Sequence, residues 1–208
     1  MGNRFAEIAF TPSVQAEQER YGSRNNYQRF LEGEPWNDAL TAKEVDFIHA
    51  RDGFYLASTS ETGWPYVQFR GGAPGFVRAL DEKTIAWANF RGNRQYVSAG
   101  NLAGNDRVAL IFMDYANRRR LKLLGAARVR RAGEDGGLAQ RIAVPGYKGE
   151  IESVVEVRVA GFDWNCPQHI TPRFTVPEVE LAIARVAEPL RALVAELEAK
   201  LASCENAR

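Results

Sequence analysis

The sequence predicts a mainly β fold, an antiparallel barrel that is closed or nearly closed, with helices on its flanks. Short segments rich in β-branched and aromatic residues recur between residues 54 and 162, separated by Gly, Pro and Asp. Their spacing of roughly 8–12 residues is typical of antiparallel barrels. Strand and helix patterns do not alternate there, and the chain contains neither GxGxxG nor GxxxxGK(S/T). A nucleotide-binding α/β fold is therefore not expected.

Composition excludes several classes of protein. The chain has 208 residues and a net charge of +1, so a nucleic acid or an anionic membrane surface is not the expected partner. Cys166 and Cys204 lie far apart, and His49 and His169 are the only histidines, so neither a zinc site nor a disulfide framework is expected. Without a secretion signal or an apolar run of about 20 residues, we expect a cytoplasmic protein.

The N-terminal part, residues 1–39, is expected to form a helical arm. Thr11 followed by Pro12 predicts a short helix that ends near Arg20. Residues 21–37 are expected to be irregular. A second helix is predicted within residues 40–53, because Thr41 and Glu44 have the spacing of a capping box and Gly53 follows the last apolar residue.

The barrel is expected to span residues 40–174. Its predicted strands are residues 54–60, 65–71, 75–80, 84–90, 107–114, 119–132 and 153–162. The segment 107–114 is almost continuously apolar, so both of its faces are expected to be buried. A short helix is expected to begin near Asn93 and Arg94 and to end at Gly100.

The C-terminal extension, residues 175–208, is expected to be a long helix. Thr175 and Glu178 form another capping box, and Pro189 should kink the helix or divide it. Apolar residues recur at steps of three and four: Ile183, Val186, Leu190, Leu193, Leu197 and Leu201. This stripe needs a partner surface, which is either the barrel of the same chain or a second subunit.

Four polar clusters interrupt the strand-rich region: "QFRGG" (68–72), "ANFRGNRQ" (88–95), "NRRRLK" (117–122) and "DWNCPQHITPR" (163–173). Each cluster alone is typical of a solvated strand end or turn. Together they supply arginines and amides from separate strands, a set that holds a phosphate well, and the start of a helix near Asn93 would add backbone N–H donors. Trp87, Phe90 and Trp164 could provide flat walls. The sequence therefore suggests a planar heterocycle that carries a phosphate.

The segments "PYVQFRGGAPGFVRALDEKTIAWANFRGNRQYVSAGNL" and "VALIFMDYANRRRLKLLGAARV" resemble the FMN-binding split-barrel family related to pyridoxamine 5′-phosphate oxidase, over about residues 40–162. The resemblance implies an antiparallel split barrel of the Greek-key type. It also implies a homodimer that binds FMN between its subunits. The expected activity is a flavin-dependent oxidoreduction, with hydride passing between flavin N5 and a small substrate that the sequence does not name.

The resemblance also implies roles for particular residues. Arg70 matches the arginine that contacts the phosphate, and Arg94, after Asn93, matches the retained cation of a basic pair. Residues 87–90 match the segment whose backbone runs along the flavin, and Arg120 occupies the position of a flavin-contacting glutamine. The full set of expected cofactor-binding residues is Gln68, Arg70, Trp87, Ala88, Asn89, Phe90, Asn93, Arg94, Gln95, Arg120, Lys122, Trp164, Gln168 and Arg173.

The sequence departs from the true oxidase after the barrel. The oxidase's C-terminal segment with its substrate-binding arginine and histidine has no recognisable counterpart, and "NCPQHITPR" stands there instead. Oxidation of pyridoxamine phosphate is therefore not the expected activity. Gln168, His169 and Arg173 are expected to meet the substrate near the partner's flavin, with His169 as the candidate proton donor. Arg120 or Lys122 would stabilise negative charge on the reduced flavin.

Other functions remain open at this point. The chain could bind a flavin without turnover, as a store or a redox sensor. The same barrel could instead hold a deazaflavin or a haem, and a haem would need His49 or His169 as its axial ligand.

Overall fold

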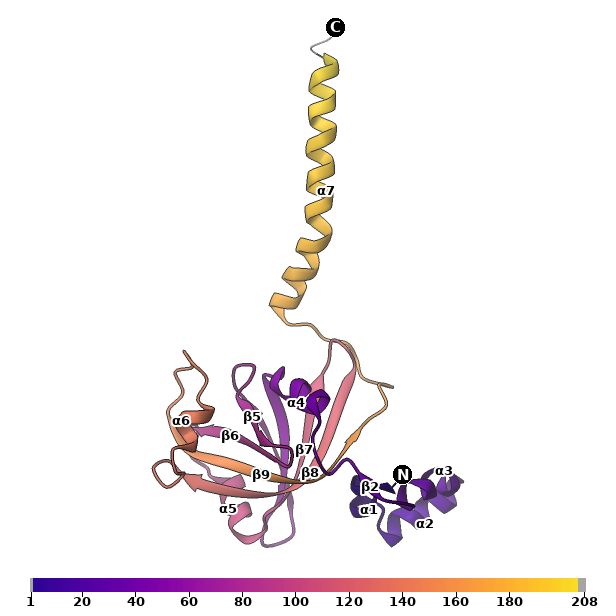
Figure 1. Cartoon of the computed structure of the whole chain (residues 1–208), viewed down its shortest axis with the longest axis vertical. Coiled ribbons are helices and arrows are strands. Elements are labelled where there is room, and N and C mark those ends of the chain that lie inside the picture. Colours follow the sequence, from indigo (N-terminus) through magenta and orange to yellow (C-terminus); the bar gives the residue numbers. More distant parts are fainter. Residues whose placement is uncertain (1, 206–208) are drawn as a thin grey trace. The chain divides into compact units, whose positions relative to one another are not determined.

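The computed structural model describes residues 2–205, which fall into two units (Figure 1). The first unit runs to Asp114 and resumes over Arg118–Gln168. The second comprises Tyr115–Asn117 and the chain from His169 onward.

Seven antiparallel strands form one sheet in the order β4-β3-β7-β8-β9-β6-β5. The strands are β3 (Gly53–Thr59), β4 (Pro65–Gly71), β5 (Val77–Asp81), β6 (Thr84–Phe90), β7 (Arg107–Asp114), β8 (Arg119–Arg131) and β9 (Ile151–Trp164). All seven predicted strands are confirmed. The two longest, β8 and β9, change register between Leu124 and Gly125. A Cβ at Gly125 would lie 2.5 Å from the Arg158 carbonyl oxygen, so this bulge requires glycine.

The core lies on one face of the sheet. Phe54 packs at 4.9 Å, between ring centroids, against both Trp87 and Phe112, and all three side chains are fully buried. Successive side chains of a strand point to opposite faces. The prediction that both faces of 107–114 are buried is therefore wrong for this chain: Phe112 is buried, whereas Ile111 is 37% exposed on the outer face.

Three helices accompany the sheet. Helix α4 (Ala42–His49) begins with the predicted capping box of Thr41 and Glu44. Helix α5 (Val97–Gly104) begins later and ends later than expected. Arg94 and Tyr96 adopt left-handed φ angles of 61° and 53°, which are incompatible with an α-helix, and Gly100 lies inside the helix. The short α6 (Leu138–Ile142), which was not predicted, covers a small apolar cluster that includes Ala88.

The N-terminal arm belongs to the first unit. It contains β1 (Gly2–Asn3), α1 (Arg4–Ala9), α2 (Pro12–Arg20), α3 (Arg24–Gln28), the 3₁₀ helix η1 (Arg29–Leu31) and β2 (Pro35–Trp36). The helix predicted from Thr11 and Pro12 is confirmed. The prediction that residues 21–37 are irregular is wrong, because α3, η1 and β2 form there.

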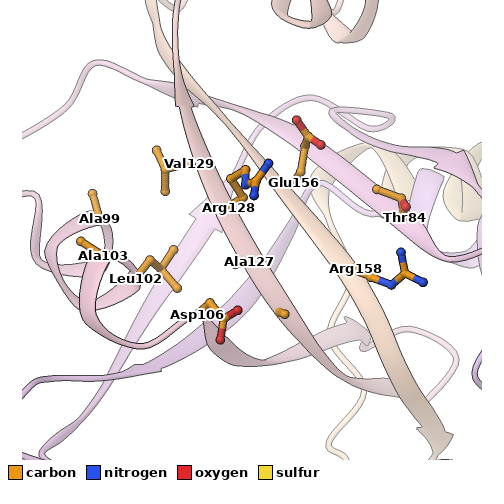
Figure 2. Close-up of a pocket in the computed structure, with 11 residues that line it drawn as sticks. Thr84, Ala99, Leu102, Ala103, Asp106, Ala127, Arg128, Val129, Glu156 and Arg158 are labelled. Carbon is orange, nitrogen blue, oxygen red and sulfur yellow. The ribbon is translucent and has the colours of Figure 1, made fainter. Parts of the chain in front are cut away.

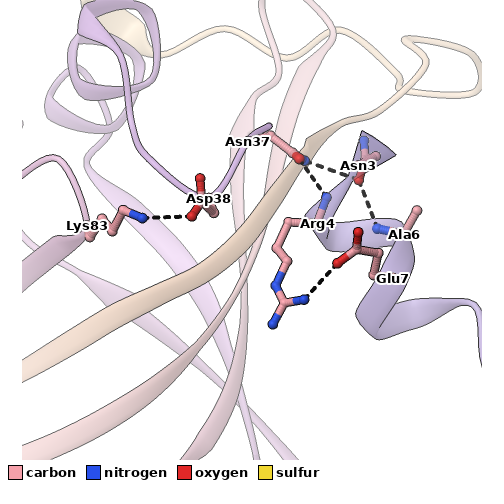
Figure 3. Close-up of polar contacts among 7 residues, drawn as sticks. All are labelled: Asn3, Arg4, Ala6, Glu7, Asn37, Asp38 and Lys83. Atoms are coloured by element: carbon pink, nitrogen blue, oxygen red, sulfur yellow. Dashed lines mark hydrogen bonds and ion pairs between the residues drawn. The ribbon is translucent and has the colours of Figure 1, made fainter. Parts of the chain in front are cut away.

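A network of asparagines fixes the arm to the barrel (Figure 3). Asn3 Oδ1 accepts from Ala6 N at 2.8 Å and so caps α1. Asn37 Oδ1 accepts from Arg4 N at 2.9 Å, and Asn37 Nδ2 donates to Asn3 Oδ1 and to the Phe162 carbonyl on β9. Nearby, Lys83 Nζ lies 2.7 Å from an Asp38 carboxylate oxygen. These bonds make the arm part of the folded first unit.

The second unit contains α7 (Val176–Glu205). Its capping box is present, since Thr175 N donates to Glu178 Oε2 at 2.7 Å and Glu178 N donates to Thr175 Oγ1 at 3.4 Å. The helix continues through Pro189 without division. Its apolar stripe is exposed, with Leu197 at 50%. Within residues 2–205, no helix has the length and apolar content needed to cross a membrane.

Candidate functional site

A cavity of about 210 Å³ lies where the two ends of the sheet approach each other. Strand β4 lies at one end of the strand order and β6 is next to the other end, yet Arg70 on β4 is hydrogen-bonded to Asn89 on β6. The cavity is lined by Tyr66, Gln68, Arg70, Asn89, Phe90, Gly92, Asn93, Arg94, Gln95, Tyr96, Val97, Ser98, Ala99 and Glu152.

Arg70 is the half-buried cation of this cavity. Its Nη1 donates to Asn89 Oδ1 at 3.0 Å, and Asn89 Nδ2 donates in turn to Ser153 Oγ at 3.2 Å. Its Nε is buried and has no hydrogen-bond partner among the described residues. Burial lowers the pKa of Arg70 from its ordinary value, although an arginine so placed remains charged. A buried charged donor without a partner is costly, so this atom favours an acceptor supplied by a ligand.

The loop between β6 and α5 supplies a second cation. Arg94 is exposed, and its Nε donates to the Tyr96 hydroxyl at 3.4 Å. That hydroxyl donates to Glu152 Oε1 at 3.1 Å. The contact with Tyr96, together with the charge of Glu152, raises the pKa of Arg94 above its ordinary value. The left-handed backbone at Arg94 and Tyr96 turns the chain sharply, so both side chains lie beside the cavity.

Helix α5 begins at the cavity wall. Its N-cap residue Tyr96 makes no side-chain capping bond among the described residues, so the first N–H groups of the helix lack that partner. Ser98, in the first turn, donates from Oγ to Gln68 Oε1 at 3.3 Å. The cavity therefore brings together two guanidinium groups, several amides, a hydroxyl and uncapped helix N–H groups. This set of donors suits a multiply charged oxyanion.

Seven of the sequence-predicted residues meet here: Gln68, Arg70, Asn89, Phe90, Asn93, Arg94 and Gln95. Trp87 and Ala88 do not line the cavity, because the side chain of Trp87 lies in the core and that of Ala88 packs near α6. Only their backbone could meet a ligand.

Arg120, Lys122 and Trp164 lie in another part of the first unit. Trp164 donates from Nε1 to Glu44 Oε1 at 2.7 Å and packs at 4.7 Å against Phe47 of α4. Lys122 Nζ lies 3.6 Å from an Asp163 carboxylate oxygen. Arg120 accepts a backbone hydrogen bond from Asn165 at 3.2 Å. None of the three lines the cavity at Arg70.

The predicted substrate-contacting residues fall in both units. Gln168, the last residue of the first unit, is exposed, and its N–H donates to Cys166 Sγ at 3.4 Å. In the second unit, His169 is exposed with a φ of 63°, and the Arg173 guanidinium lies 5.2 Å from the centroid of the Tyr115 ring.

Sequence reasoning missed four polar residues of the cavity: Tyr66, Tyr96, Ser98 and Glu152. Tyr66 could have been found, because it alternates with Gln68 and Arg70 and so shares their face of the strand. Glu152 carried no such signal. Its place in the cavity follows from the pairing of Ser153 with Asn89.

A larger cavity of about 650 Å³ lies on another side of α5 (Figure 2). Leu102 and Ala103 of α5 line one side, and Arg158 of β9 lies across from them. The charges of Arg128 and Arg158 are offset by those of Asp106 and Glu156. None of the sequence-predicted residues lines this cavity, so it does not carry the predicted chemistry.

The protein-family model described as "Pyridoxamine 5′-phosphate oxidase" matches residues 40–157. No curated protein sequence matches the chain. Among solved structures, HupZ of Group A Streptococcus is similar with a TM-score of 0.50 at 16% identity, over 65% of this chain and 100% of that one.

Two further structures resemble the chain. A candidate pyridoxamine 5′-phosphate oxidase of Lactobacillus delbrueckii has a TM-score of 0.46 at 20% identity, over 61% of this chain and 94% of that one. An FMN-binding protein of Syntrophomonas wolfei has a TM-score of 0.42 at 12% identity, over 74% of this chain and 95% of that one. Structural likeness at these identities concerns the fold alone. The family match covers more than half of the chain and includes the strands around the cavity, so the chain belongs to the pyridoxamine 5′-phosphate oxidase family.

Proposed function

We propose that the protein is an FMN-dependent oxidoreductase and that the cavity at Arg70 holds the phosphate of the cofactor. One observation carries this proposal: the buried Nε of Arg70 has no partner among the described residues, in a cavity that also receives Arg94 and the start of α5. A phosphate would supply acceptors to all three. The family to which the chain belongs supports a flavin as the group attached to that phosphate.

The residues present fit the phosphate end of the cofactor. Among the described residues, Glu152 is the only acidic side chain that lines the cavity. The Tyr96 hydroxyl and the nearby Arg91 already engage its carboxylate. Arg70 and Arg94 therefore give the cavity an excess of positive charge. Its volume of about 210 Å³ is below the roughly 300–1,000 Å³ of pockets that enclose whole small ligands, so the ring system would extend beyond it. A bound flavin would supply hydride transfer at N5 to or from a small substrate.

A homodimer would complete this site, and we propose one. Lys122, which is expected near the flavin ring, pairs with Asp163, whereas Asn89 pairs with Ser153. Ser153 and Asp163 are ten residues apart on β9, which corresponds to about 33 Å along an extended strand. A single chain therefore keeps the two expected ends of the cofactor site apart, and a second copy could bring them together.

The outer face of the sheet offers a surface for that second copy. Val67 and Phe69 on β4 are 60% and 58% exposed, and they lie beside Tyr55 on β3 and Ile111 on β7. A contiguous apolar face of this kind marks an interaction site. We expect Phe69→Lys to lower the molar mass measured by light scattering from that of a dimer to that of a monomer. Retention of the dimer by this variant would contradict the assignment of the face.

The cofactor is tested by the visible spectrum of the purified protein and by titration of the flavin-free protein with FMN. We expect a flavin spectrum and tight binding of FMN. Arg94→Ala should weaken FMN binding by at least about tenfold, because it removes a charge-assisted contact with the phosphate. Arg107→Ala, which removes an exposed arginine outside the cavity, is the matched control. A colourless protein that fails to bind FMN, or an unchanged affinity in Arg94→Ala, would contradict the proposal.

Turnover is tested separately from binding. We expect anaerobic reduction of the loaded protein by NADH or NADPH, followed by reoxidation by small acceptors. If the protein binds FMN but neither NADH nor NADPH reduces it, the alternative of a flavin store or redox sensor without turnover would be favoured. For the haem alternative, His49 Nε2 already accepts a hydrogen bond from Ala79 N at 3.3 Å, so the exposed His169 is the better candidate for an axial ligand. A deazaflavin would be recognised by its own absorption spectrum.

A further inference from the structure

A third cavity, of about 360 Å³, lies between the N-terminal arm and strands β8 and β9. The arm supplies Asn3, Phe5, Ala6, Phe10, Gln18, Tyr27 and Phe30, and the strands with the residue that follows them supply Lys122, Asp163 and Asn165. The asparagine network in Figure 3 holds the arm in this place. The contact is also close, because a Cβ at Gly161 would lie 2.9 Å from Phe5 N. The cavity is therefore a fixed part of the first unit.

Asp163 and Asn165 form one wall of this cavity, and neither lines the cavity at Arg70. Trp164 turns toward α4, where Glu44 accepts its N–H and Phe47 packs on its ring. Alternation directs Asp163 and Asn165 to the other side, where both line the cavity. Residues 163–165 thus have a structural side chain on one side and two polar side chains aimed at a cavity on the other.

Aromatic rings form most of the remaining wall. The rings of Phe10 and Tyr27 meet edge to face at 5.7 Å, and those of Tyr27 and Phe30 lie 6.0 Å apart. The ammonium group of Lys122 lies over the Phe5 ring, with Nζ 4.9 Å from the ring centroid. Aromatic side chains around a small cavity favour a flat, apolar occupant, because stacked and edge-to-face contacts stabilise a ring in that position.

One buried polar atom of the wall, Asn165 Oδ1, lacks a hydrogen-bond partner among the described residues. The other amides already have partners: Asn3 Oδ1 accepts from Ala6 N, and Gln18 Oε1 accepts from Arg24. Lys122 lies beside Asp163, and burial raises the pKa of that carboxyl although the lysine opposes the shift. The cavity is thus close to neutral and presents a buried acceptor that needs a donor.

We propose that this cavity binds an uncharged planar aromatic or heteroaromatic molecule that donates an N–H to Asn165. The proposal rests on observations separate from the phosphate cavity, because no described residue that lines this cavity also lines the cavity at Arg70. It also gives the N-terminal arm a function, because the arm supplies the aromatic walls.

The test compares indole with 1-methylindole, which has the same ring system but no N–H. Binding of both to the flavin-free full-length protein is measured by isothermal titration calorimetry. We expect indole to bind about tenfold more tightly, because 1-methylindole leaves the buried acceptor unpaired. Asn165→Ala should remove this preference. Tyr27→Ala should weaken the binding of both ligands. Tyr21→Ala changes a tyrosine of the same arm that is 79% exposed and does not line the cavity, and it should leave both affinities unchanged.

Two results would overturn the proposal. The first is the absence of indole binding in the millimolar range, which would mean that water alone occupies the cavity. The second is a preference for indole that survives Asn165→Ala, which would place the site elsewhere. Circular dichroism checks that each variant is folded, and the selectivity of Asn165→Ala remains decisive if Tyr27→Ala loosens the arm.

Discussion

Arg70 donates a hydrogen bond from Nη1 to Asn89 Oδ1 over 3.0 Å, and this bond joins strands that lie far apart in the strand order of the sheet. The cavity at Arg70 thus lies at the seam of the split barrel. Since Asn89 also donates to Ser153, a chain of side-chain bonds fixes the guanidinium before any ligand arrives. The geometry of the site is therefore set by the closure of the barrel.

Arg70→Met should reduce the affinity for FMN more than Arg94→Ala does. Arg70 is half-buried, so its contact with a phosphate is less screened by water than that of the exposed Arg94. We expect a loss of at least about a hundredfold, measured by quenching of flavin fluorescence. The difference between the variants should persist at high salt. An equal loss in both would contradict the greater role of the buried arginine.

Glu44→Ala should destabilise the first unit. Burial opposes ionisation of Glu44, but bonds from Thr41 and Trp164 outweigh it, so its pKa lies below the ordinary value. Loss of these bonds should lower the free energy of unfolding by about 1–3 kcal/mol in urea at pH 7. A group with a lowered pKa stabilises above its unfolded pKa of about 4.3, so the difference should shrink in more acidic solution. Glu61→Ala, at an exposed position, is the control; an equal effect there would contradict the argument.

His49 should make stability depend on pH between neutrality and mild acid. Burial, helped by the charge of Arg78 and opposed by Asp46, lowers the pKa of His49. The folded state therefore favours the neutral ring, and stability present above about pH 6.5 is lost as the pH falls toward the folded pKa. In His49→Gln, the urea midpoint should change less between pH 7.5 and 5.5 than in the parent protein. Parallel pH profiles would rule out this role.

The stripe on α7 should pair with the same helix of a second copy. The steps from Ile183 through Val186, Leu190 and Leu193 to Leu197 alternate three and four, the spacing of a coiled coil. In a background with both native cysteines replaced by serine, Leu197→Cys should give a covalent dimer on mild oxidation. Ala195→Cys, on the opposite face of the helix from the stripe, should not. Failure of Leu197→Cys to cross-link would favour docking of α7 on its own barrel.

The sequence predicted the strands well because their signals are local. Alternation and turn residues fixed all seven segments, and the Thr41–Glu44 and Thr175–Glu178 spacings located two helix starts. The start of α5 was placed too early, because the left-handed backbone at Arg94 and Tyr96 has no signal in residue type. The arm was also missed in part, since α3 depends on tertiary contacts rather than on a clear apolar period.

The sequence predicted that the residues around Arg70 lie together, and seven of them line one cavity. Gln68 and Arg70 share a strand face, and Asn89 to Gln95 are contiguous, so local reasoning could place them together. Trp87 and Trp164 were expected as walls because aromatic type alone does not say which way a side chain points. The roles expected of Arg120 and Lys122 would require the proposed second chain, whose arrangement no local pattern in a single sequence encodes. Those roles, the domain boundaries and the cytoplasmic location stay predictions.

The left-handed residues Arg94 and Tyr96 have a consequence for kinetics. A non-glycine residue with a left-handed backbone costs conformational free energy, and this cost is already included in the folding of the protein. If the cavity at Arg70 holds the phosphate as proposed, these turns are in place before the cofactor binds, so the loop needs no slow rearrangement. Capture of the cofactor should therefore proceed in a single fast phase in stopped-flow mixing, at a rate proportional to its concentration.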